Sequence, residues 1–197
     1  EKKELLSLRK LGSFLQGHPH RDLKYGIENS SGPLGQGYSL AVGVALAGKI
    51  DQKDYYTYCL SSDGEHNEGQ IWEGVMFAAK EKLSKLIVII DRNYIQIDGF
   101  TENVMPMDEM LAKYQAFNWH VQEIDGHNFS EIIGAVENAK NVFDKPSCII
   151  ARTIPGKGIS FMEYDYNWHG KPPNKEEEIK ALHELRTLNN RIKSEHE

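Results

Sequence analysis

The sequence predicts an α/β fold in which a parallel β-sheet carries helices on both faces. Short apolar and β-branched runs alternate along the chain with longer helical patterns, and this alternation is typical of βαβ units. No internal repeat, low-complexity tract or Pro-rich linker interrupts the alternation. The 197 residues, 40% of them hydrophobic, suffice for one packed core. We therefore expect residues 1–197 to form a single domain.

Four runs have the length and composition of strands, and five segments have helical patterns. The expected strands cover residues 55–60, 86–91, 119–124 and 147–152. The expected helices cover residues 36–49, 68–82, 107–117, 129–142 and 175–194. Several glycines and small apolar residues lie in the first helix, and they allow it to pack closely against a neighbouring helix. The last helix is rich in Glu and Lys, which indicates a solvated amphipathic helix.

Composition excludes several classes of protein. A net charge of −6 and a pI near 5.8 argue against a nucleic-acid surface and favour a small-molecule ligand. No apolar span is long enough for a membrane helix, and the N-terminus has no signal-peptide pattern. The two cysteines, Cys59 and Cys148, each lie within an apolar run, which predicts buried thiols in a reducing compartment. These observations together predict a cytoplasmic protein.

Polar residues at two expected strand ends predict a metal-bound diphosphate. Asp63 and Gly64 fall where the strand at 55–60 gives way to a helix, and Asn93 follows the next apolar strand. A helix N-terminus favours an anion, and a glycine lets the backbone approach it closely. Adjacent strand ends lie side by side in a parallel sheet, so both side chains can reach one hard cation such as Mg²⁺. The alternative makes Asp63 an N-cap and Asn93 a turn residue.

Other catalytic motifs are absent from the sequence. Residues 156–158 read Gly-Lys-Gly and lack the Ser or Thr that ends a nucleotide-binding phosphate loop. No Cys/His cluster has zinc spacing, and no Gly-x-Ser-x-Gly follows a strand. The sequence therefore argues against a nucleoside triphosphatase, a zinc site and a serine hydrolase.

The residues 62–64 and Asn93 resemble the thiamine diphosphate signature, which usually reads Gly-Asp-Gly, a spacer and Asn. Further segments match in order: Gly17-His18-Pro19, Ser31-Gly32-Pro33-Leu34-Gly35-Gln36-Gly37, Glu68-Gly69-Gln70-Ile71-Trp72-Glu73, Ile97-Asp98-Gly99 and Asn167-Trp168-His169-Gly170. Together they resemble transketolases, above all the N-terminal subunit of split transketolases, from about residue 17 to residue 174. One departure is Ser62, which stands where the family usually has the first glycine.

The resemblance implies a diphosphate-binding (PP-type) domain that holds thiamine diphosphate with Mg²⁺, or with Ca²⁺ or Mn²⁺. The implied metal ligands are Asp63, Asn93 and the backbone carbonyl of Ile95. The implied cofactor contacts are Gly32, Leu34, Gly35, Asp63, Gly64, Glu65, Asn93 and Ile97. Because the chain opens at Glu1 and enters the family pattern late, we expect part of the N-terminal region to lie upstream.

Three residues are implied to act near the substrate. His18 and His169 match transketolase histidines at the substrate end of the cofactor, where an imidazole can form hydrogen bonds and transfer protons. Glu68 matches a glutamate in a hydrogen-bonded network across the subunit contact. Each has a simpler alternative, because loop histidines are often bystanders and a glutamate in a first helical turn interacts favourably with the helix dipole.

The implied activity is transfer of a two-carbon ketol unit from a ketose to an aldose, either of which can be phosphorylated, as in the pentose phosphate pathway. In the family a glutamate of a separate pyrimidine-binding domain activates the cofactor, and nothing after residue 175 has the length of such a domain. We therefore expect this chain to be inactive alone. A C-terminal, pyrimidine-binding subunit would complete each site at the interface of a homo- or hetero-oligomer.

Two alternatives stay open. Within the thiamine superfamily the chain could belong to a 1-deoxyxylulose-5-phosphate synthase or a 2-oxoacid dehydrogenase, although the segments 32–37 and 167–170 favour transketolase. From another class, Ser62 and the late start favour a non-catalytic or regulatory binding subunit that has kept the fold.

Overall fold

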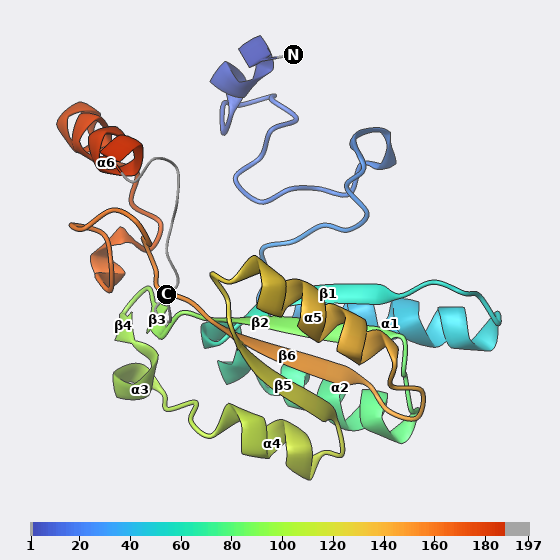
Figure 1. Ribbon diagram of the computed structural model, residues 1–197. Coiled ribbons are helices and arrows are strands. Elements are labelled where there is room, and N and C mark those ends of the chain that lie inside the picture. The colour runs from blue at the N-terminus through green and yellow to red at the C-terminus, as the bar shows by residue number, and fades with distance from the viewer. Residues whose placement is uncertain (1, 188–197) are drawn as a thin grey trace.

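The computed structural model describes residues 2–187 and is built on a four-stranded parallel sheet with the order β1-β2-β6-β5 (Figure 1). The strands are β1 (Thr57–Ser62), β2 (Leu86–Arg92), β5 (His120–Asp125) and β6 (Ser147–Arg152). In the register Ser62 lies opposite Asp91, and Arg92 lies opposite Arg152, so the carboxyl ends meet at one edge. All four predicted strands and the parallel sheet are confirmed, with bounds shifted by no more than two residues.

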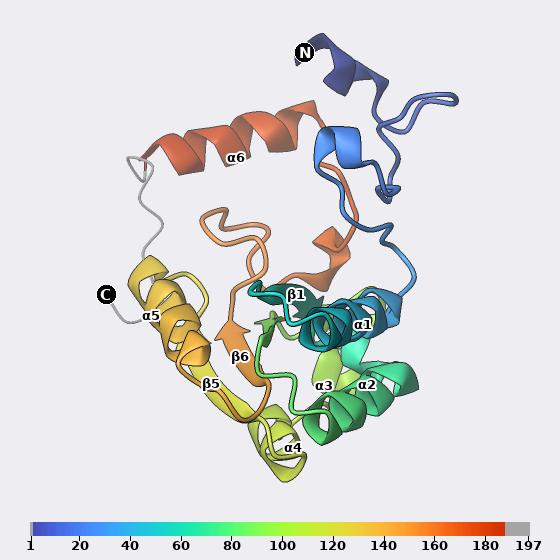
Figure 2. The same ribbon diagram turned by 90° about the vertical axis from the view of Figure 1, so that its right-hand side faces the viewer.

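Helices cover both faces of the sheet, as predicted (Figure 2). One face carries α1 (Gln36–Ile50), α2 (Gly69–Lys80) and α4 (Met110–Ala116). The opposite face carries α5 (Phe129–Lys140). Side chains alternate along β2, so Val88 and Ile90 enter the larger core while Ile87 enters the smaller core under α5. A central strand buried on both faces reads as a continuous apolar run, which is why β2 could be predicted.

The helix bounds differ from the prediction mainly around residue 107. The expected helix at 107–117 begins only at Met110, because the Glu102 carboxylate accepts hydrogen bonds from the backbone N–H groups of Met107 and Asp108. The expected helix at 175–194 is present as α6 (Lys175–Thr187), and its remainder lies outside the described residues.

Several short elements were not predicted, because each is too short to show a hydrophobic period. They are the antiparallel hairpin of β3 (Ile95–Gln96) and β4 (Gly99–Phe100), α3 (Thr101–Val104), and the 3-10 helices η1 (Lys2–Ser7), η2 (Leu23–Tyr25), η3 (Gly64–Asn67) and η4 (Tyr166–Trp168). Two of them, η3 and the β3–β4 hairpin, directly follow the predicted site residues at the ends of β1 and β2.

The N-terminal segment and α6 lie on the same side of the molecule, above the sheet in both Figure 1 and Figure 2. Residues 2–34 contain no buried residue, and residues 156–187 contain one, Ala181, where burial is described. These two segments therefore add little to the packed core. No helix within residues 2–187 combines the length and apolar character needed to cross a membrane.

The connections between strands change direction along the sheet. Helix α2 connects β1 to β2 across one face, whereas α5 connects β5 to β6 across the opposite face. The connections thus diverge between β2 and β6, which are neighbours in the sheet. In open parallel sheets, ligands bind outside the carboxyl ends of strands at such a switch point.

Candidate functional site

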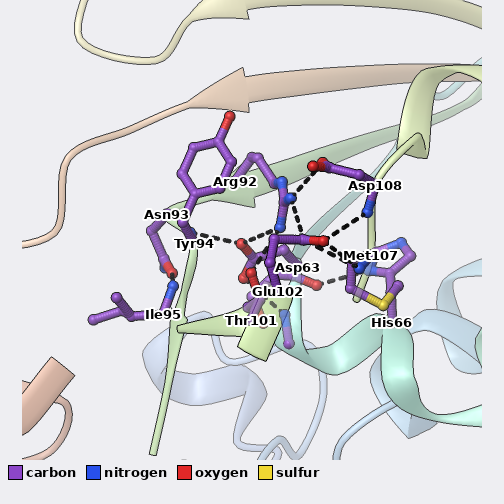
Figure 3. A network of polar contacts seen from close by, with 12 residues as sticks. Asp63, His66, Arg92, Asn93, Tyr94, Ile95, Thr101, Glu102, Met107 and Asp108 are labelled. Atoms are coloured by element: carbon purple, nitrogen blue, oxygen red, sulfur yellow. Dashed lines mark hydrogen bonds and ion pairs between the residues drawn. The ribbon is translucent and has the colours of Figure 1, made fainter. Parts of the chain in front are cut away.

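Asp63 follows β1 directly and is fully buried (0% exposed). Its Oδ1 accepts a hydrogen bond from the Gly64 N–H (2.7 Å), and its Oδ2 accepts from the Tyr94 N–H (2.7 Å) and from Arg92 Nη1 (3.0 Å). Asp63 therefore touches the residues on both sides of Asn93, so the predicted proximity of these two strand ends is realised (Figure 3).

Asn93 is held with its amide oxygen toward Ile95. The Nδ2 group donates to Asp91 Oδ2 (3.0 Å), and Oδ1 accepts from the Ile95 N–H (3.1 Å). Asp91 is fixed in turn by the hydroxyl of Thr153, which follows β6. Two of the three predicted metal ligands, Asn93 and Ile95, are therefore in direct contact. Asn93 also borders a hollow of about 480 Å³ on the α5 face.

A short 3-10 helix that was not predicted lies between Asp63 and the helix expected at 68–82. It is η3, and the longer α2 begins at Gly69. The Gly64 N–H donates to Asp63, while the Glu65 N–H donates to Ser62 Oγ (3.3 Å). Asp63 thus acts as the N-cap of η3, which was the alternative interpretation. The N-terminus of α2 therefore lies one 3-10 turn beyond Asp63, and an anion at that N-terminus stays a prediction.

The predicted cofactor loop at residues 32–35 is tied to the end of β1. The Gly35 N–H donates to Glu65 Oε1 (2.7 Å), and Ser61 Oγ donates to Glu65 Oε2 (2.6 Å). Gly35 has φ +77°, and a Cβ there would lie 2.8 Å from the Gln70 side chain, so a glycine is required. Leu34 is exposed, and its carbonyl accepts from Gln70 Nε2. The structure therefore brings Gly35 and Glu65, two of the predicted cofactor contacts, together.

His18 lies against Gly32. Gly32 has φ +124°, and a Cβ there would lie 2.7 Å from His18 Cγ, so the absence of a side chain makes room for the imidazole. His18 itself is exposed. The structure thus joins one predicted substrate-end histidine to one predicted cofactor contact.

The other predicted residues are less closely joined. Ile97 is 74% exposed in the turn of the β3–β4 hairpin, and Glu68 is the exposed N-cap of α2. His169 follows η4, where the Tyr166 ring meets the Phe100 ring edge-on with centroids 5.7 Å apart. The His169 turn therefore lies beside the hairpin. Among the described residues, the side chains of Glu68 and His169 make no hydrogen bond to another predicted site residue.

Arg92 is the main site residue that sequence reasoning missed. Its guanidinium donates to Asp63, Thr101, Glu102 and Asp108 at 2.7–3.0 Å and lies 4.2 Å from the centroid of the Tyr94 ring. A signal was available, because Arg92 shares a strand face with Val88 and Ile90 and so had to be buried and paired. Its partners could not be read from the sequence, since they come from segments without a periodic pattern.

Burial and neighbouring charges shift the pKa values of Asp63 and Arg92. Burial raises the pKa of Asp63, and the hydrogen bonds from Tyr94, Gly64 and Arg92 oppose that shift. Burial alone would lower the pKa of Arg92, but its bonds to Glu102, Asp63 and Asp108 raise the pKa above its usual value. Arg92 is therefore permanently cationic. Its one positive charge faces the carboxylates of Asp63, Glu102 and Asp108, which leaves a net charge of −2 when all three are ionised.

A second network holds the end of β1 in the core. The buried His66 contacts the Ser62 carbonyl through Nδ1 (2.7 Å) and the Tyr114 hydroxyl through Nε2 (2.7 Å). Tyr114 in turn contacts the hydroxyl of Tyr38 at 3.2 Å. The carbonyl requires a proton on Nδ1, so Nε2 accepts from Tyr114. Burial lowers the pKa of His66 to about 4, so the ring is neutral near pH 7 and serves packing.

The donor set fits a hard cation. Asp63 supplies a carboxylate oxygen, Asn93 an oriented amide oxygen and Ile95 a backbone carbonyl, which are the ligand types that Mg²⁺ accepts. Within residues 2–187, no group of three His, Cys, Asp or Glu residues is placed to hold a metal. The predicted ligand set includes only one residue of these types, Asp63, because its other two ligands are an amide oxygen and a backbone carbonyl. The negative charge around Arg92 would repel a diphosphate, so such a ligand requires a cation to accompany it.

The fold defines a class: open parallel α/β domains, which bind their ligands at the carboxyl edge of the sheet. Comparison with known proteins gives the family. Residues 1–192 match the family model described as the transketolase, thiamine diphosphate binding domain. The chain belongs to the transketolase family, through its thiamine diphosphate binding domain.

Individual relatives agree with that assignment. The chain is 48% identical over 161 residues to 6-deoxy-6-sulfo-D-fructose transketolase subunit SqwG of Clostridium sp. (strain MSTE9), which covers 81% of this chain and 58% of the relative. It is 41% identical over 179 residues to one subunit of the apulose-4-phosphate transketolase of Phocaeicola vulgatus, with 91% of this chain and 63% of the relative covered. The chain thus spans about three fifths of these relatives.

Solved structures support the same fold. The crystal structure of transketolase from Campylobacter jejuni superposes with a TM-score of 0.85 at 34% sequence identity. The superposition covers 93% of this chain and 30% of that chain. The predicted resemblance to transketolases and the predicted fold class are therefore confirmed, and the domain supports thiamine diphosphate as its cofactor.

Proposed function

We propose that this chain is the diphosphate- and metal-binding half of a transketolase that moves a two-carbon ketol unit from a ketose to an aldose. The observation that supports the proposal is the hydrogen bond from the Tyr94 N–H to Asp63 Oδ2, which brings Asp63 to the turn where Asn93 Oδ1 accepts the Ile95 N–H. Family membership and relatives named as transketolase subunits support it.

In this proposal the chain's residues bind and orient. Asp63, Asn93 and the Ile95 carbonyl hold Mg²⁺, with Mn²⁺ or Ca²⁺ as substitutes, and Gly64 admits the diphosphate close to the backbone. Thiamine diphosphate, when bound, supplies the carbanion chemistry that cleaves and forms the carbon–carbon bond. Gly32, Leu34, Gly35, Glu65 and Ile97 shape the remaining cofactor contacts.

His18 and His169 are the proposed proton-transfer groups around the sugar oxygens. Both are exposed and lie on segments outside the core, so a bound sugar can reach them. Glu68, exposed at the start of α2, is available to a second subunit.

The site requires a partner. We propose a pyrimidine-binding subunit that completes the cofactor site at an interface, since two relatives of this chain carry subunit designations in their names. The substrates are a ketose donor and an aldose acceptor, phosphorylated or not. A cytoplasmic location fits the two buried, free cysteines.

Ser62 does not favour the non-catalytic alternative. It lies within β1, in register with Asp91, and its φ is not positive, so the strand accommodates a side chain there. Its hydroxyl also accepts the Glu65 N–H. A serine in place of the family glycine is therefore compatible with the turn that carries Asp63.

Calorimetric titration tests the proposal. Thiamine diphosphate and Mg²⁺ are titrated into the chain, alone and with its pyrimidine-binding partner, and ketol transfer is assayed in parallel. We expect tight, Mg²⁺-dependent binding and turnover only with the partner, and loss of both in Asp63→Ala.

The matched control is Asp144→Ala, which removes an exposed aspartate from the turn before β6, at the opposite edge of the sheet. It should bind as the unchanged chain does. Binding without metal, or retained in Asp63→Ala, would contradict the metal site. A complex that binds the cofactor but transfers no ketol unit would favour the regulatory role.

A further inference from the structure

Arg92 uses every terminal N–H of its guanidinium. Nη1 donates to Asp63 Oδ2 (3.0 Å) and Thr101 Oγ1 (3.0 Å), while Nη2 donates to Glu102 Oε1 (2.7 Å) and Asp108 Oδ1 (2.8 Å). The side chain is 3% exposed. A guanidinium is planar with donors in a fixed fork, so four such bonds define its position closely. Figure 3 shows Asp63, Thr101, Glu102 and Asp108 gathered around Arg92.

The bonds to Asp63 leave its carboxylate with one unused acceptor position. A carboxylate offers about four lone-pair positions on its two oxygens. Oδ2 receives two hydrogen bonds, from Arg92 and the Tyr94 N–H, and Oδ1 receives one, from the Gly64 N–H. The remaining lone pair is on Oδ1. A cation at Asp63 therefore meets a single oxygen, which suits an octahedral ion better than a bidentate one.

Arg92 is itself held by the segment that follows the β3–β4 hairpin. Thr101 is fully buried, and the Glu102 carboxylate that binds Nη2 also accepts the Met107 N–H at 3.1 Å. The segment from α3 to the start of α4 thus fixes the guanidinium, and the guanidinium fixes Asp63. No other cation among the described residues forms an ion pair with Asp63.

We propose that Arg92 is a positioning residue for the metal: it holds Asp63 through Oδ2 so that Oδ1 alone is presented to the cation, with Thr101 and Glu102 as its supports. The inference rests on the proposed metal site. It goes beyond that site because Arg92 contacts neither the metal nor the cofactor and acts through Asp63.

The direction in which metal affinity changes when Arg92 is removed distinguishes a positioning role from a purely electrostatic one. A positive charge beside Asp63 repels a cation, so its removal should strengthen metal binding if charge were all that mattered. If Arg92 positions the carboxylate, its removal should weaken binding, by about 10-fold as is usual for groups that orient metal ligands. The probe is Mn²⁺ with inorganic pyrophosphate, titrated into the full chain and followed by electron paramagnetic resonance.

Three variants are compared: Arg92→Met, Arg92→Lys and Thr101→Val. Arg92→Met removes the charge, and Arg92→Lys keeps the charge but loses the planar set of guanidinium donors. Thr101→Val removes one hydrogen-bond partner of the guanidinium and leaves all charges in place. We expect weaker Mn²⁺ binding in all three, with lysine failing to rescue. Thr101→Val is nearly isosteric, so it reports on the proposal even if an Arg92 variant does not fold.

The matched control is Arg152→Met, because Arg152 is the register neighbour of Arg92 but is 60% exposed and pairs with Glu123. It should bind Mn²⁺ as the unchanged chain does. Unchanged or tighter binding in folded Arg92→Met or Thr101→Val, or full rescue by lysine, would overturn the positioning role alone. If the unchanged chain, with and without its partner, binds no Mn²⁺, the proposed metal site fails and this inference fails with it.

Discussion

Burial controls the thiol reactivity of Cys59 and Cys148. Cys59 is 7% exposed, and burial raises the pKa of its thiol to about 12, while burial raises the pKa of Cys148 well above its usual value. Only the thiolate attacks an alkylating reagent. We therefore expect iodoacetamide at pH 8.5 to modify neither thiol in the native chain and both in urea. Mass spectrometry over time checks this, and native alkylation of Cys59 as fast as that of free cysteine would show that the sheet is open at β1.

Ser62 provides a second prediction at the same scale. Ser62→Gly removes the acceptor of the Glu65 N–H and adds backbone freedom within a strand, so unfolding should require about 1 kcal/mol less. Urea denaturation measures this, with Ser62→Ala isolating the hydrogen bond. Cofactor binding should change little, because the strand conformation suits either residue. A glycine variant that binds thiamine diphosphate at least ~10-fold more tightly would instead mean that serine distorts the turn; such a factor equals about 1.4 kcal/mol.

The proximity of Asp63 and Asn93 could be predicted from the sequence. Asp63 and Asn93 stand at the ends of adjacent strands, so strand position alone brought them together. The role of Arg92 could not be predicted in the same way. Its partners Thr101, Glu102 and Asp108 lie on a short helix and a loop, where no hydrophobic period fixes a side chain's direction.

At the scale of elements, buried strands were predicted most accurately. Strand β6 was predicted without error because its run from Ser147 is buried on both faces and bounded by Pro146. The start of α4 was predicted too early, since Glu102 holds the N–H groups of Met107 and Asp108 in a loop. Helix bounds therefore failed where a side chain from another element captured backbone donors.

Two helices with the same cap should respond differently to its loss. Asn128 caps α5 by accepting the Ser130 and Glu131 N–H groups, and Asn174 caps α6 by accepting those of Glu176 and Glu177. Removing an asparagine cap costs about 1 kcal/mol of helix stability. Because α5 covers one face of the sheet, Asn128→Ala should lower global stability by about that amount.

Asn174→Ala is the matched comparison. Helix α6 has one buried residue among those described, Ala181, so its fraying should leave the main unfolding transition within a few tenths of a kcal/mol. Circular dichroism during thermal unfolding measures both variants. Equal destabilisation by the two substitutions would show that α6 folds cooperatively with the sheet.

Across the whole molecule, the site residues divide between a packed sheet and peripheral segments. Asp63, Asn93 and Ile95 stand at the ends of β1 and β2, next to the larger core. His18 and His169 lie on residues 2–34 and 156–187, which have almost no buried residues. The proposed cofactor clamp is therefore built before any ligand binds, whereas the proposed substrate-end histidines depend on weakly packed segments.

Hydrogen exchange should show this division directly. Backbone amides in β2 and β6 should exchange only through global unfolding, while those near His18 and His169 should exchange through local opening and much faster. Addition of Mg²⁺, thiamine diphosphate and the partner subunit should slow exchange around both histidines, because completing the site orders these segments. The β2 amides serve as the internal reference, since their protection can rise only with global stability. If the segments around His18 and His169 are already as protected as β2 in the free chain, the substrate end is preformed, and the partner contributes chemistry without ordering it.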